Sequence, residues 1–420
     1  MNTVRLDRET YQTTAPNGVT VLSELVDSVR SVAVGIWVRS ASAHEARPKM
    51  GVSHLLEHMV FKGTARRTAQ EIALALESRG GSLDAYTSRD TTAYQARVLD
   101  AELPEALDVL TDLVWRPVLR DTDLQLERNV ILEEINTVED TPDDQVFDLS
   151  AQALWPEHPY GYQILGTRET VSALSTDDLR QLHGRAYHAG NCVIAAAGQL
   201  DHQELLRLLD RQGWFDHDSG AGSPTMPAVP PAVRGGEQRR EKDSAQTHIV
   251  FATDTVPYAD QRKYALQVLT TNFGGGMSSR LFQRIREELG LAYAIYAFTS
   301  FYHRVGAAGV YVGTQPKTAA QAVAAIREEY MRLARESLRG AELADAKRQT
   351  QGQLMLSLES PTARMYRLAS CGVFGEPYQS LDEMQAVIAA LTEDEVAAVA
   401  AEYFAPERQT VVWLGPTTHT

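Results

Sequence analysis

The sequence predicts an α+β protein built from two homologous domains, each a mainly antiparallel sheet packed with helices. A segment rich in Gly, Pro, Ser and Ala at 216–240 divides the 420 residues into halves of similar length. Features of the first half recur in the second at a nearly constant offset, which indicates a duplication. Strands that are neighbours in sequence precede a group of helices, which favours antiparallel sheets. We therefore expect a domain at 1–215, a linker at 216–240 and a second copy at 241–420.

The duplication is carried by four pairs of segments whose offsets lie between 212 and 218 residues. One pair is β-like, and one is a glycine that follows an apolar run. Of the other two pairs, one lies at the start of a predicted helix and one contains Pro-Tyr. The pairs are 84–88 with 296–300, 158–160 with 376–378, 174–179 with 391–396, and Gly198 with Gly415. So regular a spacing predicts two copies of one unit.

The first copy gives the clearest secondary-structure signals. Apolar runs and alternation predict strands, whereas apolar residues at helical spacing predict helices, and 175–178 (Ser-Thr-Asp-Asp) supplies an N-cap. The expected strands are 19–25, 32–39, 82–99 and 192–197. The expected helices are 51–61, 69–79, 104–113, 121–138, 146–154 and 176–187.

Charge and cysteine content exclude several classes of protein. The net charge of −15 argues against nucleic-acid or anionic-membrane binding, because both depend on clustered Lys and Arg. Two cysteines cannot form a disulfide framework, so we expect a reducing, cytoplasmic location. Residues 1–20 are polar and no apolar stretch reaches 18 residues, so we expect neither a signal peptide nor a membrane span.

One pentapeptide carries chemistry, His54-Leu55-Leu56-Glu57-His58. On a helix, His54 and His58 lie on one face and can reach one ion, and Glu57 shares that face. Two imidazoles with a nearby carboxylate are what a catalytic zinc site needs, and H-x-x-E-H is the inverted zincin pattern. The alternative is an amphipathic helix with incidental polar residues.

A third zinc ligand is expected from the segment 126–138. Glu127 and Glu134 are two helical turns apart and share a face, whereas Glu133 points elsewhere. One of the pair can bind the metal while the other supports a ligand from behind. By spacing alone, an ordinary solvated helix face explains these glutamates as well.

The run GVSHLLEHMVFKGT, followed by this Glu-Glu helix, resembles the insulinase/pitrilysin family of zinc metallopeptidases, close to the mitochondrial processing peptidases and their bacterial relatives. The resemblance covers nearly the whole chain. It implies one Zn²⁺ per chain, with His54, His58 and Glu134 as ligands. It further implies Glu57 as general base and Glu127 as supporting carboxylate.

The second copy lacks the metal set, since the equivalent positions fall near Leu266, Thr270 and Gln351. It instead carries Gly274-Gly275-Gly276 and a pair of residues seven apart, Arg286 and Tyr293. A glycine run alone is more simply a flexible turn. The resemblance implies a substrate-facing loop, and an Arg/Tyr pair that donates hydrogen bonds to the scissile carbonyl or its oxyanion. In dimeric relatives that pair approaches the partner's zinc, which implies a homodimer with shared active sites.

Two further segments resemble substrate contacts of the family. The stretch Asp84-Ala85-Tyr86-Thr87 resembles an edge strand to which an extended peptide adds, although relatives usually carry Asn where this chain has Asp84. Asp144 and Asp148 stand ten and fourteen residues after Glu134, where processing peptidases recognise an arginine. An acidic, solvated helix start explains the two aspartates equally well.

The resemblance implies a zinc-dependent endopeptidase that hydrolyses extended peptides or unfolded segments, with a preference near basic residues. The alternative is a non-catalytic scaffold or peptide-binding subunit of the same fold, because some family members have lost the ligands or the base. A strictly heterodimeric enzyme with a paralogue is a third interpretation. A homodimer is more economical, since one chain carries both the zinc set and the Arg286/Tyr293 pair.

Overall fold

The computed structural model describes residues 1–217, 220 and 225–416. The chain forms two compact units, each built from several segments: residues 1–135, 163–227 and 357–378 in the first, and residues 136–162, 228–356 and 379–420 in the second. Part of the predicted linker, at 218–219 and 221–224, lies outside the described residues. Its last residues enter a strand that begins at Gly236.

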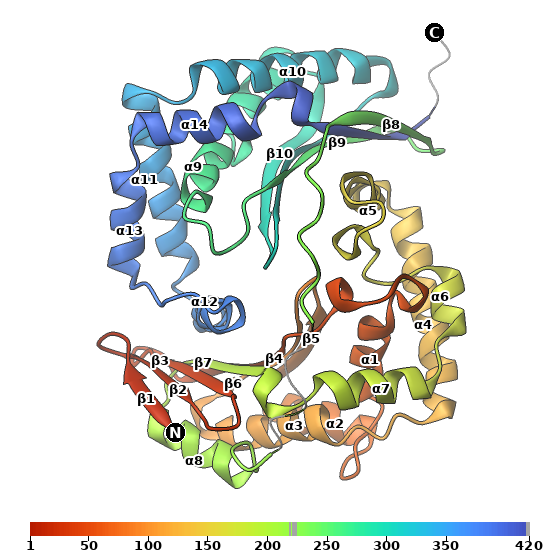
Figure 1. The fold of residues 1–420 in the computed structure, drawn as a ribbon, viewed down its shortest axis with the longest axis vertical. Coiled ribbons are helices and arrows are strands. Elements are labelled where there is room, and N and C mark those ends of the chain that lie inside the picture. The colour runs from red at the N-terminus through yellow and green to blue at the C-terminus, as the bar shows by residue number, and fades with distance from the viewer. Residues whose placement is uncertain (218–219, 221–224, 417–420) are drawn as a thin grey trace. The chain divides into compact units, whose positions relative to one another are not determined.

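The first unit contains a seven-stranded sheet of order β1-β2-β3-β7-β4-β6-β5 (Figure 1). Neighbouring strands are antiparallel except for β3 and β7, which run parallel. The strands are β1 Asn2–Arg5, β2 Thr10–Thr14, β3 Thr20–Leu25, β4 Ser31–Val38, β5 Ser82–Thr87, β6 Thr92–Leu99 and β7 Cys192–Gly198. The helices are α1 Val52–Val60, α2 Ala69–Glu77, α3 Leu103–Trp115, α4 Asp121–Asp140 as far as Ile135, α6 Arg168–Ala173, α7 Thr176–Ala186, α8 His202–Arg211 and α12 Pro361–Phe374.

The second unit contains a five-stranded sheet of order β10-β11-β9-β12-β8. Only β8 and β12 run parallel among its neighbouring pairs. The strands are β8 Gly236–Glu241, β9 Thr247–Thr255, β10 Ala292–Phe301, β11 Gly306–Thr314 and β12 Thr410–Gly415. The helices are α5 Pro142–Leu154, α9 Lys263–Gly274, α10 Ala319–Glu336, α11 Gly340–Ser357, α13 Leu381–Ala390, α14 Glu393–Tyr403 and a π-helix at Phe282–Glu288.

The two sheets repeat one strand order. The series β3-β7-β4-β6-β5 of the first unit has the same pairing directions as β8-β12-β9-β11-β10 of the second. The predicted fold class, two α+β domains with mainly antiparallel sheets, is therefore confirmed. The helices predicted for the first copy all form, and so do the strands predicted at 19–25, 32–39 and 192–197, with ends that differ by a few residues. The single strand predicted at 82–99 is instead two antiparallel strands, β5 and β6, separated by residues 88–91. The N-terminal pair β1–β2 and the helices α6 and α8 were not predicted.

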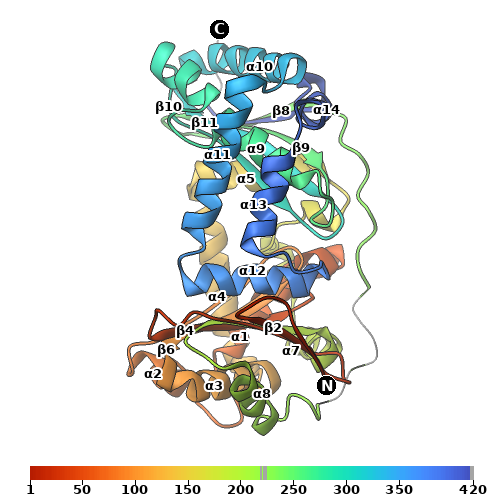
Figure 2. The same cartoon turned by 90° about the vertical axis from the view of Figure 1, so that its left-hand side faces the viewer.

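One helix from each half of the chain belongs to the unit that is built mainly from the other half. α5 comes from the first half but lies against β9 and β12 of the second unit. α12 comes from the second half but lies against β3, β4 and β7 of the first unit (Figure 2). Both faces of the first sheet are therefore buried. Along β7, Cys192, Ile194 and Ala196 face the larger core, while Val193 and Ala195 alternate into the core formed with α12. This double burial explains why the sequence of β7 is a continuous apolar run.

The first unit positions α1 through its core and its N-terminus. The apolar face of α1, with Leu55, Leu56 and Met59, is fully buried in the larger core. The helix starts at Gly51, whose φ of +87° is left-handed, and a Cβ there would lie 2.6 Å from the Leu165 carbonyl oxygen. Only glycine fits such a backbone conformation and so close an approach. The polar face of α1 is thus fixed relative to the sheet.

Candidate metal centre

The two histidines of α1 lie on its polar face, one turn apart. The ring centroids of His54 and His58 are 4.6 Å from each other, and both side chains are mostly buried, with 12% and 18% exposure. Burial, together with the smaller effect of the neighbouring His58, lowers the pKa of His54 to about 3. His54 is therefore neutral at physiological pH, which is the form that binds a metal ion.

The helix α4 brings a carboxylate to the same place. Oε2 of Glu134 lies 3.7 Å from Nε2 of His54, and its Oε1 lies 3.6 Å from Nε2 of His58. One donor atom from each of the three residues falls within 4.8 Å of the other two. Among the described residues this is the one group of three His, Cys, Asp or Glu side chains close enough to hold a metal ion.

These donors fit Zn²⁺. Two tetrahedral ligands on one zinc ion stand about 3.4 Å apart, given metal–ligand distances near 2.1 Å. The separations of 3.6 and 3.7 Å between the oxygens of Glu134 and the two imidazole nitrogens are close to that value. Two imidazoles and one carboxylate leave the fourth position open, as catalytic zinc sites do. Structural sites, in contrast, use four protein ligands and are rich in Cys.

A second glutamate of α4 orients one of the imidazoles. Nδ1 of His58 lies 3.1 Å from Oε2 of Glu127, so the ring donates its far proton there and presents Nε2 to the metal position. Lys62 holds the other oxygen of Glu127 at 2.6 Å. The side chain of Glu127 is 6% exposed, so its carboxylate is shielded from water, whereas that of Lys62 is 36% exposed. Such outer carboxylates fix the tautomer and direction of a ligating histidine.

Glu57 lies beside the donor group, and a residue of the sheet holds its carboxylate in place. Its Oε2 accepts a hydrogen bond of 2.6 Å from the hydroxyl of Thr87, at the end of the edge strand β5. Burial raises the pKa of Glu57 above its ordinary value, although the bond from Thr87 and the proximity of His58 oppose the shift. A carboxylate whose pKa is moved toward neutrality is suited to exchanging protons.

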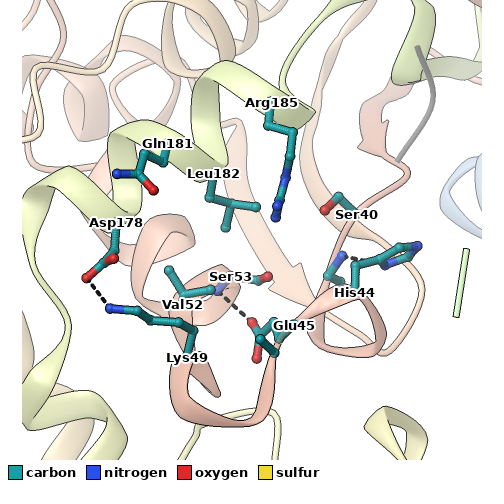
Figure 3. Close-up of a pocket in the computed structure, with 12 residues that line it drawn as sticks. Ser40, His44, Glu45, Lys49, Val52, Ser53, Asp178, Gln181, Leu182 and Arg185 are labelled. Atoms are coloured by element: carbon teal, nitrogen blue, oxygen red, sulfur yellow. Dashed lines mark hydrogen bonds and ion pairs between the residues drawn. The ribbon is translucent and has the colours of Figure 1, made fainter. Parts of the chain in front are cut away.

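A buried carboxylate supports the start of α1. Glu45 accepts hydrogen bonds of 2.8 Å from the backbone N–H groups of both Gly51 and Ser53. Figure 3 shows the bond from Ser53. Burial raises the pKa of Glu45 to about 7, and those hydrogen bonds limit the rise. Beside it is a small cavity of about 210 Å³ between this loop and α7, where Asp178 pairs with Lys49 at 2.8 Å.

The other predicted site residues of the first unit lie on β5. This strand is at the edge of the sheet, so the outer hydrogen-bonding groups of its backbone face no neighbouring strand. Asp84 is exposed. Ala85 packs against the larger core, and the hydroxyl of Tyr86 accepts a hydrogen bond of 2.9 Å from Trp37 on the opposite face. The side chains of Ala85 and Tyr86 are therefore part of the fold, and only their backbone faces outward along the edge.

The remaining predicted residues lie in the second unit. The guanidinium of Arg286, on the π-helix, stands 4.7 Å from the ring centroid of Tyr293, which is 77% exposed. Gly274 ends α9 where a Cβ would lie 2.5 Å from the backbone nitrogen of Ala297, so β10 requires glycine there. Gly275 and Gly276 follow on the surface.

The predicted acidic pair lies on α5, in the second unit. Asp144 is exposed and Asp148 is half-buried. The charge of Asp144, with that of Asp143, contributes to the raised pKa of Tyr296, whose main cause is burial. The acidic end of α5 is therefore close to the tyrosines of the second sheet.

Three contacts around the metal centre go beyond the sequence predictions. Lys62 stands four residues after His58, Thr87 is predicted only as a substrate contact, and Glu45 lies in a segment that the sequence predicts as a loop lining the site. The four-residue step from His58 to Lys62 is a helical spacing that hints at a shared neighbour. Nothing in the sequence indicates that the hydroxyl of Thr87 binds Glu57, or that the carboxylate of Glu45 binds the N-terminus of α1.

The repeated α+β unit and its single histidine-histidine-glutamate group define a two-copy protein with a candidate metal centre in its first copy. The chain belongs to the insulinase family, peptidase family M16: it matches that family over residues 20–168 and the peptidase M16 inactive domain over residues 173–350. The predicted family is thus confirmed. The replacement of the donors by Leu266, Thr270 and Gln351 agrees with the description of the second match as inactive.

Similar proteins extend along the whole chain. An uncharacterized zinc protease of Streptomyces coelicolor is 36% identical over 412 residues, covering 96% of this chain and 89% of the relative. The uncharacterized zinc protease YmxG of Bacillus subtilis is 37% identical, covering 93% and 95%. A crystal structure of a protease from Helicobacter pylori has a TM-score of 0.90 at 22% identity, covering 97% of this chain and 99% of that one, which supports the fold.

Proposed function

We propose that this protein is a zinc-dependent endopeptidase that cleaves extended peptides or unfolded segments. The observation that carries the proposal is the convergence of His54, His58 and Glu134 beside the carboxylate of Glu57. Its relatives named as zinc proteases support the same chemistry. No helix among the described residues is long and apolar enough to cross a membrane.

The ligand set would hold one zinc ion per chain. When bound, zinc supplies a Lewis acid that polarises a carbonyl and acidifies water. Glu57 accepts the proton of the attacking water and then delivers it to the leaving amine, with Thr87 holding its carboxylate in place. Glu127 keeps the His58 ring in the tautomer that presents Nε2.

The substrate groups extend the proposal along the peptide. The free edge of β5 at Asp84–Thr87 receives the peptide as an added strand, because main-chain hydrogen bonds bind an extended chain without regard to its side chains. Asp84, Asp144 and Asp148 favour basic residues by charge. Gly274 closes the loop against β10, and the exposed Gly275 and Gly276 leave room for the peptide backbone. Arg286 and Tyr293 donate hydrogen bonds to the oxyanion.

The assembly proposed is a homodimer in which the Arg286/Tyr293 pair of one protomer completes the active site of its partner. The support is that one chain carries both the donor group and this exposed pair, so no paralogue is needed.

A peptide-library experiment tests the function. Cleavage products are mapped by mass spectrometry for the wild type, for the chelator-treated protein, and for Glu57→Gln, with Glu133→Gln as the matched control on an exposed carboxylate. We expect cleavage that zinc restores after chelation, an unchanged Glu133→Gln protein, and at least about a hundredfold loss in Glu57→Gln despite full zinc content. Stoichiometric zinc without cleavage of any peptide would instead indicate the non-catalytic scaffold.

A further inference from the structure

Tyr293 stands at an irregularity of the second sheet. The pairing of β10 with β11 skips from Ala292 to Ala294 between two consecutive residues of β11, so Tyr293 is the extra residue of a β-bulge. A bulge turns a side chain away from the direction that regular alternation would give it, and bulges are frequent beside active sites. The bulge therefore sets the direction in which the phenol of Tyr293 points.

The burial pattern of β10 agrees with the bulge. Ala292 and Ile295 both belong to the core of the second unit, although residues three apart in a regular strand lie on opposite faces. One extra residue between them brings both onto the same face. Tyr293 is left 77% exposed, and its ring centroid lies 4.7 Å from the guanidinium carbon of Arg286. The irregular start of β10 thus keeps the tyrosine ring beside the arginine.

Leu291, directly before β10, is held through both of its backbone groups. Its N–H donates a hydrogen bond of 2.9 Å to the carbonyl of Ile285, in the π-helix that also carries Arg286. Its carbonyl accepts a hydrogen bond of 2.5 Å from the hydroxyl of Thr314, the last residue of β11. Leu291 therefore ties the π-helix to the bulged end of β10, and so ties Arg286 to Tyr293.

Thr314 is the side chain on which this link depends, because the other contact of Leu291 joins two backbone groups. Thr314 is 1% exposed and Leu291 is 6% exposed, so the bond between them is shielded from water. A buried carbonyl that loses its donor is costly. Without the hydroxyl, a shift of Leu291 toward water would relieve that cost, and the neighbouring bulge would move with it.

We propose that Thr314 is a positioning residue for the peptidase reaction. It holds the bulge so that Tyr293 stays beside Arg286 and its phenol can donate a hydrogen bond to the oxyanion. Thr314 does not touch the substrate, since it acts through Leu291 and Tyr293. The inference rests on the proposed function, because the role given to Tyr293 belongs to that reaction.

Steady-state kinetics on the zinc-loaded, full-length protein tests this role. Thr314→Val removes the hydroxyl and keeps the side-chain shape. We expect kcat to fall at least about tenfold and KM to change less than about threefold, because an oxyanion donor acts mainly in the transition state. Thr314→Ser keeps the hydroxyl and should keep most of the rate. The matched control, Thr350→Val, removes a buried hydroxyl that donates to a carbonyl on α11, and should leave the rate unchanged.

Two further measurements distinguish positioning from a general loss of stability. In the Tyr293→Phe background, Thr314→Val should change kcat less than about twofold, since its effect passes through a phenol that is already missing. Fluorine NMR of protein labelled with 3-fluorotyrosine does not depend on cleavage. The resonance of Tyr293, assigned by its absence from Tyr293→Phe, should shift in Thr314→Val and return in Thr314→Ser.

The possible failures of this inference and of the proposed function are distinguishable. An active wild type refutes the role of Thr314 alone if Thr314→Val leaves kcat or the Tyr293 resonance unchanged. An equally large loss of kcat in the Tyr293→Phe background also refutes it. A wild type that cleaves no peptide refutes the proposed function, and the role of Thr314 falls with it.

Discussion

The groups proposed to bind the metal ion or transfer protons are oriented by a second set of residues behind them. Glu127 binds His58 on one side and Lys62 on the other, so it joins a ligand to a cation. Thr87 likewise orients Glu57, by donating a hydrogen bond to its carboxylate. Each outer contact is a single hydrogen bond or ion pair, which makes its contribution measurable by one substitution.

Replacing Glu127 with Gln should weaken zinc binding by about ten- to a hundredfold, because an outer carboxylate raises the basicity of the histidine and fixes its ring. Competition with a fluorescent chelator measures the affinity directly. Glu133→Gln on the same helix is the matched control, since Glu133 lies on the exposed side of α4. Equal affinity of the two variants would show that Glu127 does not support His58.

Replacing Thr87 with Val should lower kcat about tenfold, the value of one hydrogen bond of about 1.4 kcal/mol that positions the base. The isosteric valine removes the hydroxyl and leaves the β-branched shape of the strand. Thr87→Ser restores the hydroxyl and should restore most of the rate. Steady-state kinetics on one peptide, with zinc content measured in parallel, separates this effect from loss of the metal.

At the scale of elements, α1 depends on a loop residue for its N-terminus. The carboxylate of Glu45 stands where the first N–H groups of the helix would otherwise be unsatisfied, and where the helix dipole favours negative charge. Because Glu45 is buried, its ionisation has a cost to the folded state that the unfolded chain does not have.

This cost predicts a pH dependence of stability. The pKa of Glu45 is raised to about 7 in the folded protein, so its protonated form stabilises the fold at low pH, and that contribution is lost as the pH rises through 7. Relative to Glu45→Gln, the wild type should lose up to about 3 kcal/mol of unfolding free energy between pH 5 and 8. Urea unfolding of both zinc-loaded proteins gives the difference, and parallel curves would contradict it.

Much of the first copy could be predicted because its signals are local. The strand β7 is a continuous apolar run, α7 carries a capping box between Ser175 and Asp178, and H-x-x-E-H places three polar groups on one helical face. The contacts of Thr87 and Glu45 could not be predicted, because they depend on how β5 and a loop meet α1. The sequence likewise could not predict that α5 and α12 each pack on the sheet built mainly from the other half of the chain. The pattern of an amphipathic helix does not specify which sheet it covers.

At the scale of the whole molecule, duplication has separated two roles. Both copies keep the strand order, but the first alone holds the donor group among the described residues, and the second carries the Arg286/Tyr293 pair. This division is the basis for proposing that two chains cooperate.

Mixing two inactive variants tests that cooperation. Glu57→Gln and Arg286→Ala, combined and allowed to exchange subunits, should regain about a quarter of the wild-type activity, because half of the dimers are mixed and each has one intact site. Analytical ultracentrifugation establishes the dimer in parallel. No recovery in a mixture that forms mixed dimers would mean that each chain completes its own site.

The packing of α12 on the first sheet also affects how the protein folds during synthesis. On the ribosome the first sheet is synthesised long before α12 emerges, so the face with Ala33, Trp37 and Val193 must wait for a distant segment to cover it. The last helix of the first unit ends at residue 374 of 420. Premature termination upstream of α12 therefore leaves an apolar sheet surface exposed, a state that chaperones and proteases recognise. The fold thereby couples the survival of the copy that holds the donor group to synthesis of the chain as far as α12.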